Sequence, residues 1–402
     1  MYLKCIHDDG TFSSYPITKE PRMPHASSLG YIDSQSKTES ALSILHAYIH
    51  KQKAVLFDES NQSLQTQIKN LGIQRFPSDI AKKTIFDAKH FQFIYYTSGT
   101  TGHPLAALKT KENLQTEVEM LSELLKKYQI KKVLVTVPFI HLYGSLFGLL
   151  YPLHQHIDIV IKEHFLPFDL IDLIDPYTMV VTTPLYIKAL NKLQAKKKLS
   201  HTLFVSSTAP LDNESIQTFH ALYGSDILQI FGSTETGGIA YKMNTDTSWT
   251  PFSSVCVKSN QEGLMSVASP FVSATLFNDT FIDTQGEIQT FDYIEEEENT
   301  FTLIGRSNKI FKLAGKRYST VQIEDILESQ KEITKALVFV GLEKRSLRGE
   351  FLEIILETKK EYSVAGIKQI LKEKLSNLKF PIRLKMVEKI PVNQVGKKLR
   401  IT

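Results

Sequence analysis

Short apolar runs alternate with amphipathic segments of helical period over most of the chain. The apolar runs predict strands at 54–57, 93–96, 133–137, 157–161, 179–182, 203–206 and 227–231. Apolar residues at helical spacing predict helices at 41–48, 61–71, 110–128, 169–174, 185–193 and 213–222. Strands that alternate with helices favour an α/β fold with doubly wound, mostly parallel sheets covered on both faces.

The pattern changes near residue 255, where shorter alternating segments predict a β-rich subdomain up to residue 303. The acidic run 295–298 fits an exposed hairpin tip. Beyond a boundary at 305–315, the pattern predicts helices at 321–329 and 363–375 and strands at 336–340, 351–356 and 383–387. We therefore expect a large N-terminal domain, 1–304, and a small, mobile α+β C-terminal domain, 305–402. Residues 1–40 carry too little pattern to assign.

A loop rich in Gly, Ser and Thr follows the predicted strand 93–96, and a helical pattern follows the loop. Gly99 and Gly102 allow tight turns, so the backbone N–H groups and hydroxyls can converge on a phosphate. No lysine follows Gly102, so the loop is not of the Walker type. From these residues alone, a polar surface turn is an equal alternative.

Composition and charge limit the classes of function. The chain has 402 residues, 42% hydrophobic and 22% charged, with a formal net charge of +4, which suggests no nucleic-acid partner. Its two cysteines, Cys5 and Cys256, lie far apart and outside any metal-binding spacing. No apolar run is long enough for an integral membrane segment, and the N-terminus lacks a signal-peptide core. A cytoplasmic location is the expectation.

Several chemically suggestive residues follow predicted strands, where ligands of parallel sheets gather. His141 lies in PFIHLYG after the strand 133–137, although a lone histidine is more often a core or surface residue. Thr234 and Glu235 lie in FGSTETGG after 227–231, where a hydroxyl and a carboxylate suit a phosphate oxygen and Mg²⁺. A helix N-cap with an acidic first turn is the structural alternative. Phe231 offers an aromatic face for a base.

Three later residues complete the set. Asp292 follows the strand-like GEIQTF, and Arg306 opens GRSNKIFKLAG; both types of side chain can bind a sugar or phosphate. Lys397 lies in the terminal PVNQVGKKLR, where a lysine is by default a solvated charge. Its functional alternative is to neutralise an oxygen that gains charge in a transition state.

The order of these motifs identifies a family resemblance. The chain contains, in sequence, YYTSGTTGHP, PFIHLYG, SSTAPL, QIFGSTETGG, Asp292, GRSNKIFKLAGKRYSTVQIE and PVNQVGKKLR. This series resembles the adenylate-forming superfamily, in which acyl- and aryl-CoA synthetases, peptide-synthetase adenylation domains and luciferases belong. The resemblance extends from about residue 93 to the C-terminus, with a shortened N-terminal region.

The resemblance implies an ATP-binding site that uses Mg²⁺ and CoA. The loop that holds the β- and γ-phosphates corresponds to Thr97, Ser98, Gly99, Thr100, Thr101 and Gly102. Residues next to the adenine, the α-phosphate and the ribose correspond to Ala209, Pro210, Phe231, Gly232, Thr234, Asp292 and Arg306. Glu235 corresponds to the Mg²⁺ ligand, and Lys397 to the catalytic lysine.

The implied activity is an acid–thiol ligase, an AMP-forming acyl-CoA synthetase. A carboxylate attacks the α-phosphorus and pyrophosphate leaves; the small domain then turns about a hinge at Asn308 and a thiol displaces AMP. Residues that would face CoA in this second state are Lys312, Gly315 and Lys316. His141 corresponds to the gate of the acyl pocket, with Tyr143 and Phe147 as lining residues that suggest a short or aromatic acid. PFIHLYG contains no acidic residue, which disfavours an amino-acid substrate.

Three departures from the family pattern leave questions open. Leu105 replaces the lysine that usually follows the phosphate loop; either Lys109 or Lys111 reaches the pyrophosphate instead, or both point elsewhere on the helix. Asn308 is neither of the usual hinge residues, Asp and Lys. The short N-terminal region leaves open a smaller acyl pocket or a homodimer that covers the exposed face. An acyl carrier protein as thiol acceptor, and a non-catalytic nucleotide-binding protein, stay as alternatives.

Overall fold

The computed structural model describes residues 1–20, 28–78, 83–96, 105–306, 310–313, 316–342, 350–375, 381–392 and 398. The chain forms two compact units, which are described separately. The first comprises Met1–Val257 and Ser266–Ile288, and the second comprises Lys258–Met265 and Gln289–Thr402. The strands of the predicted β-rich subdomain thus contribute to both units. The domain boundary at 304/305 that the sequence pattern suggested stays a prediction.

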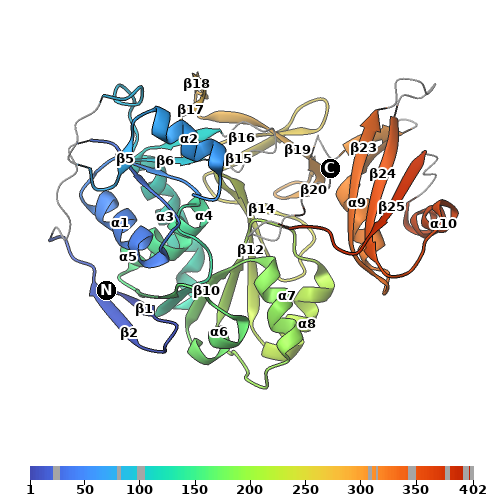
Figure 1. Ribbon diagram of the computed structural model, residues 1–402, viewed down its shortest axis with the longest axis horizontal. Coiled ribbons are helices and arrows are strands. Elements are labelled where there is room, and N and C mark those ends of the chain that lie inside the picture. Colours follow the sequence, from blue (N-terminus) through green and yellow to red (C-terminus); the bar gives the residue numbers. More distant parts are fainter. Residues whose placement is uncertain are drawn as a thin grey trace. The chain divides into compact units, whose positions relative to one another are not determined.

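The first unit is built on two large sheets (Figure 1). Within the described residues, the larger sheet contains β1 (Tyr2–Ile6), β2 (Phe12–Pro16), β8 (Lys132–Val135), β9 (Asp158–Lys162), β10 (Thr178–Thr182), β11 (Leu203–Ser206), β12 (Asp226–Ser233), β13 (Gly237–Met243) and β14 (Thr250–Pro251). Their order is β14-β13-β12-β11-β10-β8-β9-β1-β2, and the strands from β12 to β1 run parallel. The carboxyl ends of these parallel strands therefore meet at one edge.

The second sheet of this unit contains β3 (Gly30–Ile32), β4 (Ala54–Leu56), β5 (Gln74–Arg75), β6 (Phe93–Tyr96), β7 (Ala106–Lys109), β17 (Thr275–Asn278) and β18 (Thr280–Asp283). The order is β18-β17-β7-β6-β4-β3-β5, in which β6, β4, β3 and β5 are parallel. Strand β7 pairs antiparallel with β6, so the chain leaves β6 and returns beside it through residues 97–105. The sequence pattern predicted only a helix after this loop and missed β7.

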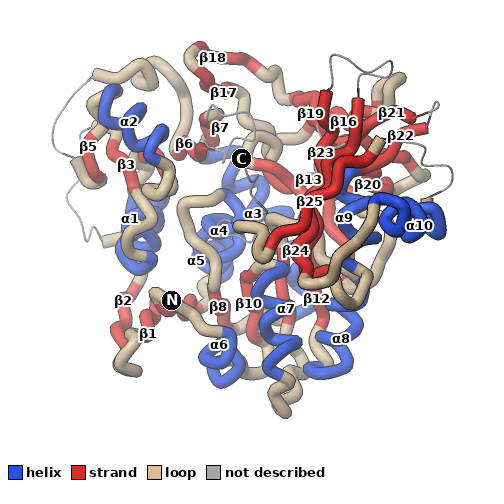
Figure 2. Tube along the Cα trace, turned by 45° about the vertical axis from the view of Figure 1, so that its right-hand side comes forward, coloured by secondary structure: helices blue, strands red, loops and turns tan. Residues whose placement is uncertain are grey.

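Helices cover both sheets. In chain order they are α1 (Lys37–Ile49), α2 (Gln62–Asn70), α3 (Lys111–Leu125), α4 (Leu142–Ser145), a π-helical turn (Leu146–Leu150), α5 (Tyr151–Gln155), α6 (Pro167–Leu173), α7 (Pro184–Leu193) and α8 (Asn213–Tyr223). Helices α6, α7 and α8 pack on one face of the larger sheet through one apolar cluster, and Figures 1 and 2 both show α7 beside α8. Helix α2 packs on the smaller sheet. Helix α1 contacts strands of both sheets, and α3 reaches the larger sheet through a hydrogen bond from Gly238 N to Glu117.

The second unit carries mostly antiparallel strands. These are β15 (Cys256–Ser259), β16 (Leu264–Ala268), β19 (Glu287–Glu296), β20 (Phe301–Arg306), β21 (Ile310–Leu313), β22 (Lys316–Ser319), β23 (Ile333–Leu342), β24 (Glu350–Thr358) and β25 (Ile382–Val387), where β15, β16 and β19 begin or end in the first unit. Helices α9 (Thr320–Glu328) and α10 (Val364–Lys374) share one apolar core with β23 and β24. The predicted helices and strands of this region are present. The acidic run 295–298 is exposed as expected, but its first two residues end β19 and only the last two lie in the turn before β20.

Local sequence explains the helix that follows β7. Thr110 caps α3: its hydroxyl accepts from Asn113 N at 3.1 Å, and its own N–H donates to Asn113 Oδ1 at 3.0 Å. This reciprocal pair satisfies N–H groups that have no partner inside the helix. Leu114, Val118 and Leu121 then form the buried stripe that the spacing predicted. In the part of the chain described here, no helix combines the length and the apolar character needed to cross a membrane.

Candidate active site

The parallel strands of the larger sheet bring several predicted site residues to one edge. His141 follows β8, Ala209 and Pro210 follow β11, and Thr234 and Glu235 follow β12. Hydrogen bonds tie these segments together: Ser207 Oγ, after β11, donates to Ile230 O of β12 at 2.9 Å. The arrangement is the one in which α/β sheets bind ligands, beyond the carboxyl ends of their strands.

Thr234 and Glu235 lie in a tight turn between β12 and β13, and no helix begins there, so the alternative of a helix N-cap is wrong. Ser233 and Thr236 close the turn: Ser233 N donates to Thr236 Oγ1 at 3.1 Å, and Thr236 N donates to Ser233 Oγ at 3.2 Å. The Glu235 carbonyl accepts from Ser273 N at 2.9 Å. The backbone that carries the Glu235 carboxylate is therefore fixed on both sides.

Two glycines make this turn sterically feasible. A Cβ on Gly232 would lie 2.4 Å from the carbonyl oxygen of Gly237. Gly237 has a φ of +73°, and a Cβ there would lie 2.7 Å from Phe271 Cβ and 2.8 Å from Glu117 Oε2. Only glycine fits both positions without displacing backbone or buried side chains.

Two buried charged residues lie behind the turn. Lys109, at the end of β7, donates from Nζ to Glu235 O at 3.1 Å and to Phe271 O at 2.5 Å. Glu117, on α3, accepts at Oε1 from Gly238 N at 2.6 Å. Burial lowers the pKa of Lys109, and the negative charges of Glu117 and Glu235 only partly oppose this shift. Burial likewise raises the pKa of Glu117, and the positive charge of Lys109 only partly opposes that shift.

This geometry bears on the missing phosphate-loop lysine. Lys109 is completely buried and its ammonium group is held by two backbone carbonyls, so the expectation that Lys109 replaces the lysine missing at Leu105 is wrong. The Lys111 ammonium group lies 5.4 Å from the centre of the Tyr48 ring, in cation–π range.

Phe231, at the end of β12, forms part of an aromatic surface. Its ring centroid lies 5.4 Å from that of Trp249, at an interplanar angle of 45°. The Lys242 ammonium group lies 4.9 Å from the centre of the Trp249 ring. The single tryptophan of the chain thus lies beside the residue predicted to face adenine, a neighbour that the sequence pattern did not indicate.

His141 and Tyr143 open the short helical segment after β8. Burial lowers the pKa of His141, and the nearby Asp58 carboxylate only partly opposes this, so the imidazole is neutral at pH 7. The Tyr143 hydroxyl donates to Val205 O at 2.7 Å and to Thr182 O at 3.0 Å. Its ring packs against Phe147 at 5.3 Å between centroids. Tyr143 is therefore rigidly held at the ends of β10 and β11.

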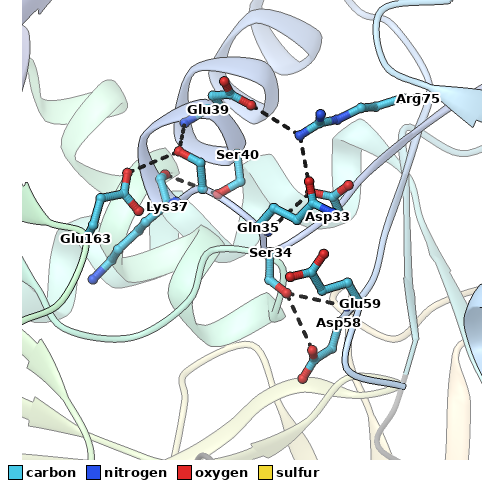
Figure 3. Close-up of polar contacts among 11 residues, drawn as sticks. Asp33, Ser34, Gln35, Lys37, Glu39, Ser40, Asp58, Glu59, Arg75 and Glu163 are labelled. Carbon is cyan, nitrogen blue, oxygen red and sulfur yellow. Dashed lines mark hydrogen bonds and ion pairs between the residues drawn. The ribbon is translucent and has the colours of Figure 1, made fainter. Parts of the chain in front are cut away.

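The N-terminus of α1 borders the same edge of the sheet (Figure 3). The Glu163 carboxylate, just after β9, accepts from Lys37 N at 2.7 Å and from Thr38 N at 2.9 Å. The Lys37 ammonium group donates to Val135 O, at the end of β8, at 2.7 Å, and burial lowers its pKa to about 7. Figure 3 shows the Lys37 side chain extending away from the Arg75–Asp33 ion pair. The unassigned N-terminal region thus supports the strand that leads to His141.

In the second unit, Asp292 and Arg306 lie directly opposite each other on β19 and β20. Arg306 Nε donates to Asp292 Oδ1 at 3.0 Å; the aspartate side chain is 6% exposed and the arginine side chain 47% exposed. The family resemblance placed both next to the ribose, and in the structure they form an ion pair. Lys312 and Lys316 lie on β21 and β22. The other predicted residues lie outside the described residues: Thr97, Ser98, Gly99, Thr100, Thr101, Gly102, Asn308, Gly315 and Lys397.

Lys398, next to the predicted catalytic lysine, is anchored in the second unit. Its ammonium group lies 3.0 Å from Glu324 Oε2 and 2.5 Å from Glu328 Oε1, and donates to Ala336 O at 2.8 Å. Burial alone would lower the pKa of Lys398, but the two carboxylates outweigh it and raise that pKa. The resulting stabilisation is present below the ordinary pKa of lysine and is lost only as the pH rises through the raised value.

Replacing Lys398 with methionine is expected to destabilise the second unit by about 3 kcal/mol, because two largely buried carboxylates lose their counter-ion. Hydrogen exchange of amides in α9 and β23 measures this loss. Lys360→Met is the control, since its partner Glu332 is 51% exposed and the pair should contribute less than about 1 kcal/mol. Equal effects of both substitutions would contradict the role of Lys398 as an anchor.

Comparison with known proteins gives the family. A model of the AMP-binding enzyme family matches residues 26–261, more than half of the chain. The chain belongs to the AMP-binding enzyme family. This confirms the resemblance to adenylate-forming enzymes.

Curated relatives are distant in sequence. The 4-coumarate–CoA ligase of Cereibacter sphaeroides is 25% identical over 255 residues, which cover 61% of this chain and 56% of that protein. The peroxisomal OPC-8:0-CoA ligase 1 of Arabidopsis thaliana is 23% identical over 403 residues, which cover 90% of this chain and 73% of that protein. The matched part thus spans little more than half of the first relative.

Solved structures confirm the predicted fold class. The o-succinylbenzoate CoA synthetase of Bacillus subtilis, in complex with ATP and a magnesium ion, has a TM-score of 0.79 at 17% identity, over 98% of this chain and 95% of that chain. The ATP-bound MatB of Rhodopseudomonas palustris has a TM-score of 0.76 at 17% identity, over 99% of this chain and 94% of that chain.

The donor set of this AMP-binding enzyme fits Mg²⁺ better than a softer metal. Within the described ranges, no group of three or more His, Cys, Asp or Glu side chains is arranged around a common metal position. The Glu235 carboxylate is partly exposed and accepts no hydrogen bond from the described residues. A single free carboxylate suits Mg²⁺, which keeps several waters and takes its other ligands from a phosphate.

Two residues that support the site, Lys109 and Glu117, were not predicted from the sequence. Glu117 carried a usable signal: it lies between Leu114 and Val118 on the buried face of α3, where a charged side chain requires a partner. Lys109 carried a weaker one, a lysine at the end of an apolar run. Lys109 and Glu117 both lie behind Gly237 and Gly238 only because the two sheets pack together. No local sequence pattern predicts this packing.

Proposed function

We propose that this protein is an ATP-dependent acid–thiol ligase that activates a carboxylic acid as an acyl-adenylate and transfers the acyl group to CoA. The observation that carries the proposal is the fixed turn whose Glu235 carboxylate accepts no hydrogen bond from the described residues, beside the Phe231–Trp249 pair at the carboxyl edge of a parallel sheet, in an AMP-binding enzyme. The CoA-ligase activities named for the distant relatives support the choice of reaction.

The first half-reaction is assigned to the residues that the family resemblance singled out for ATP. Thr234 would bind the α-phosphate and Glu235 would hold Mg²⁺, which neutralises phosphate charge when bound. Phe231 with Gly232 would pack on adenine beside Ala209 and Pro210. Residues proposed to bind the terminal phosphates and the ribose are Thr97, Ser98, Gly99, Thr100, Thr101, Gly102, Asp292 and Arg306.

No general base is needed in this step. A carboxylate oxygen of the acid attacks the α-phosphorus in line, the bond to the pyrophosphate oxygen breaks, and pyrophosphate leaves. Lys397 would donate to the acid carboxylate and to the α-phosphate as negative charge shifts between them. The contribution of the enzyme is position and charge.

The second half-reaction uses a different set. A thiol sulfur attacks the acyl carbon, the bond to the AMP phosphate oxygen breaks, and AMP leaves. Asn308 is proposed as the hinge that brings Lys312, Gly315 and Lys316 to the acyl-adenylate. His141, neutral at pH 7, would border the acyl group without adding charge.

The acid is proposed to be aromatic or short. Tyr143 packs against Phe147, and its hydroxyl is committed to two backbone carbonyls. An acyl chain packed against these two side chains would contact aromatic rings and no charged group. The neutral His141 adds no partner for a substrate ammonium group, in line with the absence of an acidic residue from this segment.

Thioester formation tests the proposal. The protein is incubated with Mg·ATP and separate aryl, short-chain and fatty acids, with either CoA or a phosphopantetheinylated acyl carrier protein as acceptor, and products are identified by mass spectrometry. We expect AMP and an acyl-CoA in equal amounts. If a thioester forms on the carrier protein but not on CoA, the carrier protein is the acceptor and the assignment of CoA is wrong. ADP as the nucleotide product, or no acid-dependent turnover, would contradict the proposal.

A further inference from the structure

Two buried charged residues connect the sheets of the first unit behind the Glu235 turn. Lys109 ends β7, the strand through which the chain returns from the phosphate loop, and belongs to the smaller sheet. Glu117 lies in α3, the helix that follows β7. Both reach the turn between β12 and β13, which belongs to the larger sheet.

Lys109 holds the backbone of the turn at Glu235, the proposed Mg²⁺ ligand. Its ammonium group, with 0% of the residue exposed, donates to Glu235 O and Phe271 O. Ser273 N donates to the same Glu235 carbonyl. A completely buried ammonium group is costly, so these contacts must offset a large desolvation penalty, whereas a plain core position would take an apolar residue.

Glu117 holds the end of the same turn. Its Oε1 accepts from Gly238 N at 2.6 Å, and its carboxylate fills the space that Cβ atoms on Gly237 and Gly238 would otherwise occupy. The turn is thus held by a donor at Glu235 and by an acceptor at Gly238. These two contacts fix both the position and the tilt of the segment between them.

We propose that Lys109 and Glu117 are positioning residues: through the carbonyl of Glu235 and the amide of Gly238 they fix the direction of the Glu235 carboxylate. This inference rests on the proposed function, because it concerns how the same turn presents its Mg²⁺ ligand. The same contact joins β7 to the turn that carries Glu235.

Hydrogen exchange of the turn tests this without any enzymatic assay. In Lys109→Met and in Glu117→Leu, peptides that contain residues 234–238 are expected to exchange about tenfold faster than in the wild type, because the turn opens locally. Peptides from α8 serve as the internal reference and should be unchanged. Glu117→Gln keeps an oxygen for Gly238 N and should keep the slow exchange.

The Mg²⁺ dependence separates positioning from stability. Lys109→Met is expected to raise the Mg²⁺ concentration for half-maximal adenylate formation by about tenfold or more, the scale seen when an outer-shell partner of a metal ligand is lost. The double variant Lys109→Met/Glu117→Gln removes the unpaired buried carboxylate, so its melting temperature should recover while its Mg²⁺ requirement stays raised. Lys126→Met, which removes an exposed lysine at the end of α3, is the control for both measurements.

The outcomes decide between the two roles. Faster exchange at 234–238 together with a raised Mg²⁺ requirement in the double variant supports positioning. An Mg²⁺ requirement that returns to the wild-type value with the melting temperature, or unchanged exchange at the turn, overturns it. If the wild type forms no adenylate with any acid, the proposed function fails, and hydrogen exchange alone then decides whether Lys109 and Glu117 hold the turn.

Discussion

Replacing Lys397 with alanine is expected to slow acyl-adenylate formation by about a hundredfold to a thousandfold, the loss seen when one preorganised donor to a transition-state oxygen is removed. The thiol step should be spared, because Lys397 is proposed to act only while the mixed anhydride forms. Single-turnover assays measure the steps separately: AMP-ester formation from Mg·ATP and acid, and thioester formation from a supplied acyl-adenylate and CoA.

A matched control uses Lys389→Ala, which removes an exposed lysine of the same unit. This variant should retain both half-reactions. If Lys397→Ala slows the two half-reactions equally, or slows neither, the assignment of the terminal lysine is wrong.

Glu235→Gln is expected to reduce adenylate formation by at least about a hundredfold, because a bound metal supplies several kcal/mol of charge stabilisation to the phosphoryl group. Glutamine preserves the size of the side chain, and the turn is held by backbone contacts to Glu235 O, so the fold should persist. Isothermal titration with Mg·ATP and initial rates over a range of Mg²⁺ concentrations measure the change.

Glu214→Gln serves as the comparison, since Glu214 is an exposed carboxylate in the first turn of α8. Its Mg²⁺ dependence should match that of the wild type. A Glu235→Gln protein with unchanged Mg²⁺ dependence would exclude Glu235 as the metal ligand. A simultaneous fall in melting temperature would instead indicate that the carboxylate supports the turn itself.

Much of the fold followed from local pattern. Between residues 130 and 231, the strands β8 to β12 and the helices α6, α7 and α8 were predicted, because buried parallel strands and their covering helices leave strong periodic signals, whereas the helical segment 142–155 was not assigned. Strand β7 was missed, since its short run, Ala106–Lys109, begins with two alanines and ends in a charge. The hairpin β1–β2 was left unassigned because YLKCI and FSSYP do not alternate between apolar and polar residues, although the burial of these residues alternates.

The sequence predicted which site residues follow which strands, but not the residues that hold them in place. Parallel topology places Thr234, Glu235 and His141 at one edge, which is why positions after strands were informative. The nature of the Glu235 turn was not predictable: an N-cap and a hairpin turn share the same small and polar residues, and β13 decides between them. The contacts of Lys109 and Glu117 with the Glu235 turn were not predictable from the local sequence, because they join two sheets.

Acid-dependent exchange of labelled pyrophosphate into ATP tests the central claim most directly, since it reports reversible attack of a carboxylate on the α-phosphorus. The measurement uses the full chain with Mg·ATP, no CoA and one acid at a time. We expect label to enter ATP with an aryl or short-chain acid, and to fall to background in Glu235→Gln. Exchange that needs no acid, or that is absent with every class of acid although ATP binds, would contradict the account.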